Sequence, residues 1–550
     1  MRRTIAALVL CLLAACGGGG GDAPLPAGGL LDTTVYSAQP HAQLAGAQEA
    51  VAVSTHRLTL GGRELVYTAT AGHLIARDPV ADSAQAKVFY VAYTLDAADP
   101  AMRPVTFFYN GGPGSASVWL HLGSFGPKRL VTGVPATTAA RPFPLVDNAD
   151  SLLDVSDLVF VDAVGTGRSQ AIAPNINRDF WGVDTDAELF RDALRRWIVR
   201  HGRAASPFFL YGESYGGPRT AVLARRLQEV GLFPAGLLLQ SPALNYRSNC
   251  GVMDDVPMSC AGYLPSYAAT GAWHGLTQPV PDDLDAWVDD ARQFAAGPYG
   301  SALERFMSGG GPDASLYAPL AALTGLPAPQ WQSAFNLGPT RYRERLIPGQ
   351  LIGRYDARMT AANGSALAAE GDPSSTWLTS SFQSAINSYL ENTLGYRNAS
   401  TYVLLGNAID SWDFSHAGQP LPDSVPDLAA ALDADPALRV LAISGLHDLA
   451  TPFNVTEGDL ARIASARITV RNYPGGHMSF LDDTTRPIQR AEVAAFISGA
   501  VAARPLRRAP LRGTLPAPPD RAGVPAAATG PLTPEPAVQA PMRDPWVPPR

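Results

Sequence analysis

The sequence predicts an α/β fold in which a mostly parallel central sheet carries helices on both faces. Short and almost wholly apolar runs, such as residues 105–109 and 208–211, are typical of buried strands. Segments with helical periodicity lie between most of these runs, notably residues 187–201 and 219–230. Strands that alternate with helices favour a parallel sheet, because the helices connect parallel neighbours and cover both faces.

The strands follow a regular order along the chain. Residues 56–60 and 64–68 alternate around Gly61-Gly62, which predicts a β-hairpin. A further strand is expected at residues 87–94, before the buried strand at 105–109. The remaining strands are expected at residues 158–161, 208–211, 236–239, 440–443 and 468–472.

The chain divides into a two-part core, an insertion and a tail. The alternation of strands and helices stops between residues 243 and 430, where tryptophan, proline, glycine and helical segments such as 283–295 occur. We expect a largely helical cap over the carboxyl edge of the sheet, with a separate domain as the alternative. The core then comprises residues 51–242 and 431–503. Residues 504–550 are rich in Pro, Ala and Arg without apolar periodicity, which predicts disorder.

The composition is that of a globular protein with rather few charges. The 550 residues, 46% hydrophobic and 17% charged, suit one large domain with an insertion or two domains. A net charge of −7 gives no basic surface, so nucleic acid is not expected as a partner. HExxH helices, phosphate-binding GxxxxGK[ST] loops and CxxC pairs are absent from the sequence, so neither a metal nor an organic cofactor is expected. The sequence does not indicate an oligomeric state.

The N-terminus predicts export. Residues 1–16 have a basic start and an apolar stretch, and they end in LAAC, which resembles a bacterial lipobox with Cys16 as the lipidated residue. Residues 17–50 then form a flexible tether. Gly17, in place of aspartate, favours the outer membrane facing the periplasm in a Gram-negative host. The alternative is an ordinary secretory signal and a secreted or periplasmic protein.

Cys250 and Cys260 are expected to form a disulfide. Cys11 lies in the cleaved segment and Cys16 takes the lipid, which leaves this pair in an exported chain. A metal site is the alternative, but it lacks nearby His or Cys ligands.

The strongest functional signal is the string GESYG at residues 212–216, between a strand and a helix. A tight turn there lifts the Ser214 hydroxyl above the sheet edge, and the flanking glycines permit the turn. The following helix directs its free N–H groups and its positive dipole end at the place where an oxyanion forms. The string therefore predicts Ser214 as the nucleophile of a hydrolase.

Two later loops supply the partners that a nucleophilic serine needs. The strand at 440–443 leads into a loop with Asp448, and the strand at 468–472 ends in a glycine-rich turn with His477. The order Ser, Asp, His, each on a loop after a strand, is that of α/β-hydrolases. His477 would take the serine proton and pass it to the leaving group. Asp448 would hold the histidine tautomer and stabilise the imidazolium.

A glycine-rich loop after an early strand is expected to supply the second oxyanion donor. The strand at 105–109 ends in NGGPGS at residues 110–115, whose N–H groups can approach a ligand closely. An ordinary tight turn is the alternative, but the three residues described above favour an oxyanion loop.

Together these motifs resemble the serine carboxypeptidase family of α/β-hydrolases, especially its bacterial members. The resemblance covers roughly residues 55–500 and is carried by five strings: NGGPGS (110–115), residues 148–170, GESYGG (212–217), GLHDLATP (445–452) and GGHM (475–478). It implies an α/β-hydrolase fold with a cap insertion and hydrolysis of C-terminal peptide bonds through an acyl-enzyme.

The resemblance also implies a role for each matching residue of the catalytic centre. Ser214 is the nucleophile, Asp448 the orienting acid and His477 the base. The oxyanion hole is formed by the backbone N–H groups of Gly112 and Tyr215.

Recognition of the substrate's C-terminal carboxylate is implied for Asn110, the Gly111 N–H and Glu213. Glu213 helps only when it is protonated, because two bare carboxylates repel. In eukaryotic members this glutamate pairs with a second acid, and Ser124 stands at that position here. Glu213 thus lacks one reason to stay protonated, which argues against strong carboxypeptidase activity at acid pH.

Two further departures concern the surroundings of the site. Ser115 replaces a cysteine that is common in the family, which implies a lost disulfide. Arg168 stands where an aromatic residue is usual, and we expect it to change the pocket wall.

Two other functions use the same features. An esterase or acyltransferase would use the same triad on small esters, since acyl transfer does not fix the leaving group. A non-catalytic binding protein on a hydrolase scaffold is the third possibility, and the intact Ser214, Asp448 and His477 argue against it.

Overall fold

The computed structural model describes residues 28–46, 48–96, 98–252 and 258–503. The predicted signal segment with Cys16, the first part of the tether and the predicted disordered tail lie outside the described residues. Within these ranges, none of the helices combines the length and apolarity needed to cross a bilayer.

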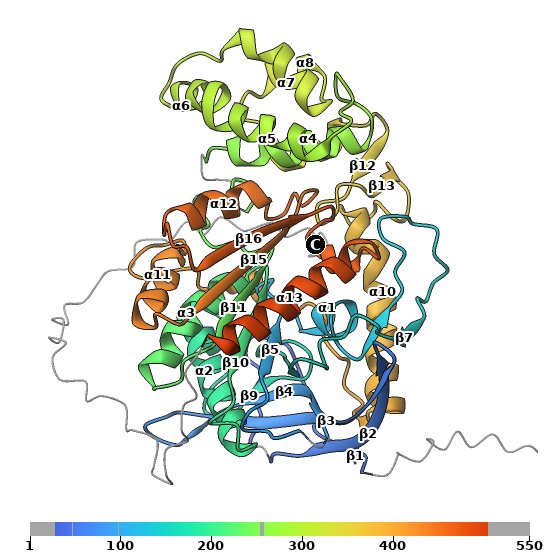
Figure 1. Ribbon diagram of the computed structural model, residues 1–550, viewed down its shortest axis with the longest axis vertical. Coiled ribbons are helices and arrows are strands. Elements are labelled where there is room, and N and C mark those ends of the chain that lie inside the picture. Colours follow the sequence, from blue (N-terminus) through green and yellow to red (C-terminus); the bar gives the residue numbers. More distant parts are fainter. Residues whose placement is uncertain (1–27, 47, 97, 253–257, 504–550) are drawn as a thin grey trace, which may run out of the picture.

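In the described residues, a ten-stranded sheet forms the centre of the molecule, in the order β16-β15-β11-β10-β5-β8-β4-β3-β2 with β9 beside β4 (Figure 1). Its strands are β2 (Val51–Leu60), β3 (Arg63–Arg77), β4 (Ala84–Leu95), β5 (Val105–Tyr109), β8 (Asp157–Val161), β9 (Gln170–Ala171), β10 (Phe208–Glu213), β11 (Gly236–Gln240), β15 (Arg439–Gly445) and β16 (Ile468–Tyr473). The six adjacent strands β8, β5, β10, β11, β15 and β16 are all parallel to one another. Strands β4, β3, β2 and β9 pair antiparallel and form the other edge of the sheet. The predicted α/β-hydrolase fold, with a mostly parallel sheet, is confirmed.

Helices cover both faces of this sheet. The core helices are α1 (Val118–Gly123), α2 (Val183–Arg200), α3 (Gly216–Glu229), α10 (Pro373–Ser388), α11 (Val425–Ala434), α12 (Phe453–Ala461) and α13 (Thr485–Ala502). Successive residues of β10 pack to opposite sides: Phe208 and Leu210 join the core beneath α2, α3 and α11, whereas Phe209 and Tyr211 join the core beneath α1, α10 and α13. A strand buried on both faces requires the continuous apolar run that the sequence shows here.

The first half of the predicted insertion projects from the sheet and has a small core of its own. It contains α4 (Leu264–Trp273), α5 (Leu284–Phe294), α6 (Gly300–Met307), α7 (Tyr317–Thr324), α8 (Ala328–Ser333), α9 (Pro339–Arg345) and the hairpin of β12 (Gln350–Ile352) and β13 (Thr360–Ala362). Figure 1 shows α4 to α8 stacked above the ends of β15 and β16. Trp331, Tyr267 and Tyr342 are fully buried within this part.

The second half of the predicted insertion packs onto the core. Helix α10 contacts α1, and α11 contacts α3. The physical reason is that the apolar sides of both helices, with Trp377 in α10 and Leu428 in α11, complete the two cores of the sheet. The cap over the sheet edge is therefore shorter than the range 243–430.

Short elements complete the described chain. The two remaining small sheets pair β1 (Leu30–Leu31) with β14 (Tyr396–Arg397) and β6 (Lys128–Leu130) with β7 (Leu145–Asp147). Short helical turns occur at η1 (Asn177–Phe180), η2 (Ala261–Tyr263), η3 (Ala295–Tyr299), η4 (Ala314–Leu316), η5 (Tyr389–Thr393), η6 (Ala408–Ser411) and η7 (Ser479–Leu481).

The part of the predicted tether that the structure describes lies against the core. Strand β1 pairs with β14, and the Tyr396 hydroxyl donates to Asp32 Oδ2 at 2.7 Å. Leu44 is buried against Ile75 and Ile172. These few apolar and acidic side chains find partners in the core, so this stretch is not a free tether despite its composition.

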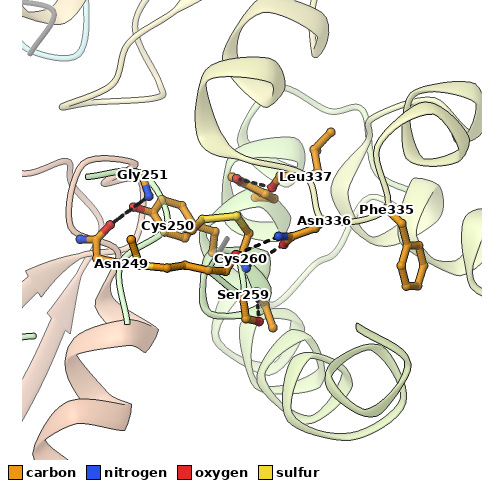
Figure 2. Close-up of a disulfide and its surroundings, with 12 residues drawn as sticks. Asn249, Cys250, Gly251, Ser259, Cys260, Phe335, Asn336 and Leu337 are labelled. Carbon is orange, nitrogen blue, oxygen red and sulfur yellow. Dashed lines mark hydrogen bonds between the residues drawn. A yellow bond between two sulfur atoms is a disulfide. The ribbon is translucent and has the colours of Figure 1, made fainter. Parts of the chain in front are cut away.

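The predicted disulfide between Cys250 and Cys260 is present, with 5.4 Å between the two Cα atoms (Figure 2). The Asn336 side chain accepts a hydrogen bond from the Cys260 N–H at 2.9 Å and donates to the Met258 carbonyl at 2.8 Å. The disulfide thus closes a short loop at the start of the insertion, and the Asn336 hydrogen bonds tie this loop to the segment before α9.

Candidate active site

Ser214 occupies a strained turn between β10 and α3. Its φ of +62° lies in the left-handed region, which side chains other than glycine rarely adopt. A Cβ atom on Gly212 would lie 2.2 Å from the Gly216 carbonyl oxygen, and one on Gly217 would lie 2.4 Å from Pro242 Cβ. Only glycines therefore allow the strand and helix to approach this closely, and the turn has the form expected for a nucleophilic serine.

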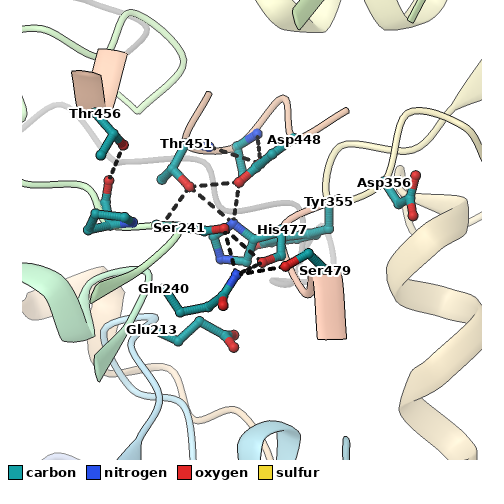
Figure 3. A network of polar contacts seen from close by, with 12 residues as sticks. Glu213, Gln240, Ser241, Tyr355, Asp356, Asp448, Thr451, Thr456, His477 and Ser479 are labelled. Atoms are coloured by element: carbon teal, nitrogen blue, oxygen red, sulfur yellow. Dashed lines mark hydrogen bonds and ion pairs between the residues drawn. The ribbon is translucent and has the colours of Figure 1, made fainter. Parts of the chain in front are cut away.

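Asp448 and His477 meet beside this turn. Asp448 follows β15 and His477 follows β16, and Nδ1 of the histidine lies 2.8 Å from Oδ2 of the aspartate (Figure 3). The other carboxylate oxygen accepts the N–H groups of Ala450 and Thr451 at 2.8 and 3.1 Å. Because Nδ1 faces the aspartate, Nε2 is the nitrogen that remains for the serine proton. His477 and Ser214 line the same cavity.

The surroundings of His477 favour its protonated form. Burial lowers the pKa of His477, but the charge of Asp448 and its hydrogen bond raise it more, so that the pKa is raised overall. This arrangement strengthens His477 as a base, because Asp448 stabilises the imidazolium that forms when His477 takes a proton.

Thr451 contacts both Asp448 and His477, and the sequence analysis did not single it out as a residue of the site. Its Oγ1 lies 2.9 Å from Asp448 Oδ2, 3.1 Å from His477 Nδ1 and 2.8 Å from the Ser241 carbonyl oxygen (Figure 3). A hydroxyl has one hydrogen to donate, so the group holds the pair by donating to one neighbour and accepting from another. The available signal was its position three residues after Asp448 in the string GLHDLATP.

The loop between β12 and β13 of the insertion accepts hydrogen bonds from the loops that carry His477 and Asp448. The His477 N–H donates to the Tyr355 carbonyl at 2.6 Å, and the Leu449 N–H donates to the Arg354 carbonyl at 3.0 Å. The Tyr355 ring packs edge-on against the His477 ring with 5.0 Å between centroids. From the core side, the Ser241 hydroxyl donates to the His477 carbonyl at 2.8 Å. The histidine is thus fixed from the cap and from the sheet.

The glycine-rich loop after β5 lies against the Ser214 turn. A Cβ atom on Gly111 would lie 2.4 Å from the Tyr215 backbone nitrogen, so this position admits only glycine. Gly112 has a φ of +101°. In the described part of the chain, the N–H groups of Gly112 and Tyr215 donate to no other protein group. Such N–H groups beside a nucleophile are the donors that an oxyanion hole requires.

Asn110 and Glu213 lie side by side in the cavity that contains Ser214. The Asn110 amide donates to Glu213 Oε1 at 2.8 Å, and its oxygen accepts the Leu120 N–H at 3.2 Å, which fixes its orientation. Glu213 is only 4% exposed, and its second oxygen, Oε2, has no hydrogen-bond partner in the described structure. The cavity is also lined by Gly111 and Trp119.

Burial favours the protonated form of Glu213 although no second acid stands at position 124. It raises the pKa of Glu213 to about 7, against the smaller lowering effects of His477 and of the Asn110 hydrogen bond. Ser124 is buried, and its hydroxyl donates to the Leu120 carbonyl at 2.6 Å. Glu213 therefore lacks a partner acid at position 124, and burial together with the charge of Asp448 disfavours its charged form.

Arg168 and Ser115, the two other positions that depart from the family pattern, lie in different surroundings. Arg168 is buried and does not line the cavity that contains Ser214; it stacks on Tyr396, with 5.3 Å from its guanidinium carbon to the ring centroid. The expectation that it forms a pocket wall is therefore wrong. Ser115 does line the cavity, where its hydroxyl accepts the Trp119 indole N–H at 3.0 Å.

A cluster of three or more His, Cys, Asp or Glu side chains able to hold a metal ion does not occur among the residues that the structure describes.

Comparison with known proteins gives a partial match. The family model for serine carboxypeptidases matches residues 63–230, which contain the loop at 110–115 and Ser214 but neither Asp448 nor His477. Serine carboxypeptidase-like 33 of Arabidopsis thaliana is 28% identical over 155 residues, which are 26% of this chain and 28% of that protein. The chain thus matches little more than a quarter of that relative's length.

Similarity to solved structures is low. Proline iminopeptidase from Mycobacterium smegmatis has 16% identity over 82% of this chain and 99% of that chain, with a TM-score of 0.34. An esterase from Thermogutta terrifontis has 14% identity over 82% of this chain and 99% of that chain, with a TM-score of 0.30. A haloalkane dehalogenase variant from Bradyrhizobium elkanii has 14% identity over 82% of this chain and 98% of that chain, with a TM-score of 0.31. Scores at this level say nothing about activity.

Proposed function

We propose that this protein is a serine-type carboxypeptidase of the serine carboxypeptidase family, which removes the C-terminal residue of peptides. The partial family match and the arrangement of Ser214, Asp448 and His477 support a serine hydrolase. The observation that carries the finer proposal is the buried Glu213 carboxyl, whose Oε2 faces no protein partner in the cavity beside Ser214.

A carboxylate is the group that complements this cavity. With a pKa of about 7, Glu213 is neutral at acid pH and has an O–H to donate. The Asn110 amide and the Gly111 N–H supply further donors on the same wall. An apolar ester alcohol would leave these buried donors unpaired, which costs about 1–3 kcal/mol for each group. A free C-terminal carboxylate accepts from all of them.

The proposed reaction proceeds in two acyl transfers. The Ser214 oxygen attacks the carbonyl carbon of the last peptide bond while its proton passes to His477, and the N–H groups of Gly112 and Tyr215 stabilise the oxyanion. The C–N bond then breaks, and His477 gives the proton to the departing amine. Water, deprotonated by His477, then attacks the acyl-enzyme. The bond between the acyl carbon and the Ser214 oxygen breaks, His477 returns the proton to Ser214, and the shortened peptide leaves with a new carboxylate.

A matched pair of substrates tests the proposal. An N-blocked dipeptide with a free C-terminus and its C-terminal amide differ only in the carboxylate. We expect release of the free amino acid to exceed cleavage of the amide by at least about a hundredfold in kcat/KM, because two or more charge-assisted hydrogen bonds are lost with the amide. Ser214→Ala is the inactive control. Equal cleavage, or faster turnover of small esters than of any peptide, would overturn the proposal in favour of an esterase.

We also propose that the protein is exported and anchored through a lipid on Cys16, with the catalytic part outside the cytoplasm. The disulfide between Cys250 and Cys260 supports an oxidising compartment. Labelling of cells with a radioactive fatty acid tests the anchor. Label in the full chain and its loss in Cys16→Ser is expected, and equal labelling of both contradicts it.

A further inference from the structure

Strand β11 leads into two fully buried polar residues, Gln240 and Ser241. The strand lies between β10, which leads to Ser214, and β15, which leads to Asp448. A glutamine amide is costly to bury unless its polar atoms are paired. Gln240 does not occur among the described residues that line the cavity with Ser214. Its amide is therefore paired with protein groups and not with a substrate.

The side chain of Gln240 holds the backbone of His477. Its Nε2 donates to the His477 carbonyl at 3.1 Å (Figure 3). A carbonyl oxygen can only accept, so the nitrogen of the amide must face it, and this fixes the orientation of the amide. The Ser241 hydroxyl donates to the same carbonyl at 2.8 Å. Two consecutive side chains thus hold one carbonyl of the catalytic histidine.

The main chain of the same two residues contacts the other catalytic loops. The Ser214 N–H donates to the Gln240 carbonyl at 2.9 Å. The Ser241 carbonyl oxygen lies 2.8 Å from the Thr451 hydroxyl, which also contacts Asp448. Gln240 is therefore bonded to both Ser214 and His477, to the first through its carbonyl and to the second through its side chain.

A second buried glutamine, Gln489 of α13, keeps Gln240 in place. Gln489 Nε2 donates to Gln240 Oε1 at 2.7 Å, and the Ser479 hydroxyl donates to Gln489 Oε1 at 2.9 Å. Gln240 Nε2 lies 3.2 Å from the Ser479 oxygen, so the three side chains close a ring of hydrogen bonds. A buried polar network in which every amide is paired makes its surroundings rigid. Because Ser479 lies two residues after His477, the ring also holds the histidine loop.

We propose that Gln240 is a positioning residue, which sets the distance between the Ser214 hydroxyl and the His477 ring through the backbone of both residues. A base takes a proton efficiently only within hydrogen-bond reach, so a displaced ring slows both acyl transfers. Substrate binding does not depend on Gln240, since this residue does not line the cavity. The inference rests on the part of the proposed function in which His477 is the base, and it applies to peptides and esters alike.

The test replaces Gln240 by Met, which has a similar length and lacks the amide. We expect kcat to fall about tenfold, the size of one lost hydrogen bond, with less than about a twofold change in KM. Ser241→Ala removes a single oxygen and disturbs folding least, and its kcat should fall on the same order. Gln383→Met is the matched control, because the Gln383 amide of α10 donates to the Tyr402 carbonyl at 2.9 Å and not to a catalytic loop. It should keep the wild-type kcat.

A second readout does not depend on the substrate. The hydrogen between His477 Nδ1 and Asp448 Oδ2 gives a proton NMR resonance far downfield of the amide protons, and a mobile ring exchanges this hydrogen faster with water. We expect the resonance to broaden in Gln240→Met and to stay sharp in Gln383→Met. A purely structural role of Gln240 would lower stability but leave kcat for each folded molecule and the resonance unchanged.

The outcomes separate this inference from the proposed function. Wild-type kcat in folded Gln240→Met and Ser241→Ala, a loss confined to KM, or an unchanged resonance in Gln240→Met would overturn the positioning role. If the wild type releases no C-terminal amino acid but ester turnover and the resonance depend on Gln240 as expected, the carboxypeptidase proposal fails and the role of Gln240 stands.

Discussion

Replacing Glu213 by Gln should change the way in which the stability of the fold depends on pH. Glutamine has nearly the same shape, and its side-chain oxygen can still accept from Asn110, but it cannot ionise. In the wild type, burial raises the pKa of Glu213 from 4.5 to about 7 in the folded state. The unfolded chain therefore loses this proton at a lower pH than the folded chain does.

The sign and size of the effect follow from this difference. Below pH 4.5 both states hold the proton, and the group adds no penalty. As pH rises through 4.5 towards 7, only the unfolded state ionises, so the wild type loses stability until the folded state ionises as well. At about 1.4 kcal/mol for each unit, the loss at pH 8 amounts to about 3 kcal/mol.

The assay is urea unfolding of both proteins at pH 4, 6 and 8, followed by tryptophan fluorescence. We expect the stability of Glu213→Gln relative to the wild type to rise by about 3 kcal/mol between pH 4 and pH 8. Glu344→Gln, at an exposed glutamate of the cap, should show no such rise. The reasoning is refuted if the difference between Glu213→Gln and the wild type is the same at all three pH values.

Three further changes test other parts of the structure. Thr451→Val should lower kcat by about tenfold with little change in KM, because the hydrogen bond from Thr451 to the Asp448–His477 pair is lost. Thr451→Ser keeps the hydroxyl and should restore kcat. A change in KM alone, measured by steady-state kinetics, would contradict this prediction. Gly111→Ala should abolish turnover, because its Cβ would lie 2.4 Å from the Tyr215 nitrogen, whereas Gly338→Ala, with open space around its Cβ, should keep full activity. Replacing Cys260 by Ser should destabilise the protein by about 3 kcal/mol in thermal unfolding, and an unchanged melting temperature would argue against a structural role of the disulfide.

The sequence was most informative where one local pattern determines the structure. The continuous apolar runs at β5 and β10 predicted buried strands, because only strands covered on both faces need such runs. The glycines around Ser214 predicted the turn, since the close approach of strand and helix excludes larger residues at these positions. The order of the three catalytic candidates placed Asp448 beside His477, because the ends of neighbouring parallel strands meet at one edge of the sheet.

The sequence was least informative where packing between distant parts of the chain determines the surroundings of a side chain. The protonation of Glu213 depends on how completely the fold buries it, and no local pattern encodes that burial. Arg168 was expected in the pocket wall, but its guanidinium stacks on Tyr396, more than 200 residues away in the chain. Thr451 was overlooked because only the folded structure shows that its hydroxyl lies between Asp448 and His477.

Recognition of a C-terminal carboxylate by a protonated Glu213 is the central claim, and the ratio of kcat/KM between a free-acid peptide and its amide, measured at pH 5.5 and pH 8.5, tests it most directly. Protonation of His477 affects both substrates alike and cancels in this ratio. Glu213, with a pKa of about 7, is neutral at the lower pH and charged at the higher one. We predict a large preference for the free acid at pH 5.5 that falls at least tenfold at pH 8.5, where two carboxylates repel. A ratio near one at both pH values would contradict the claim.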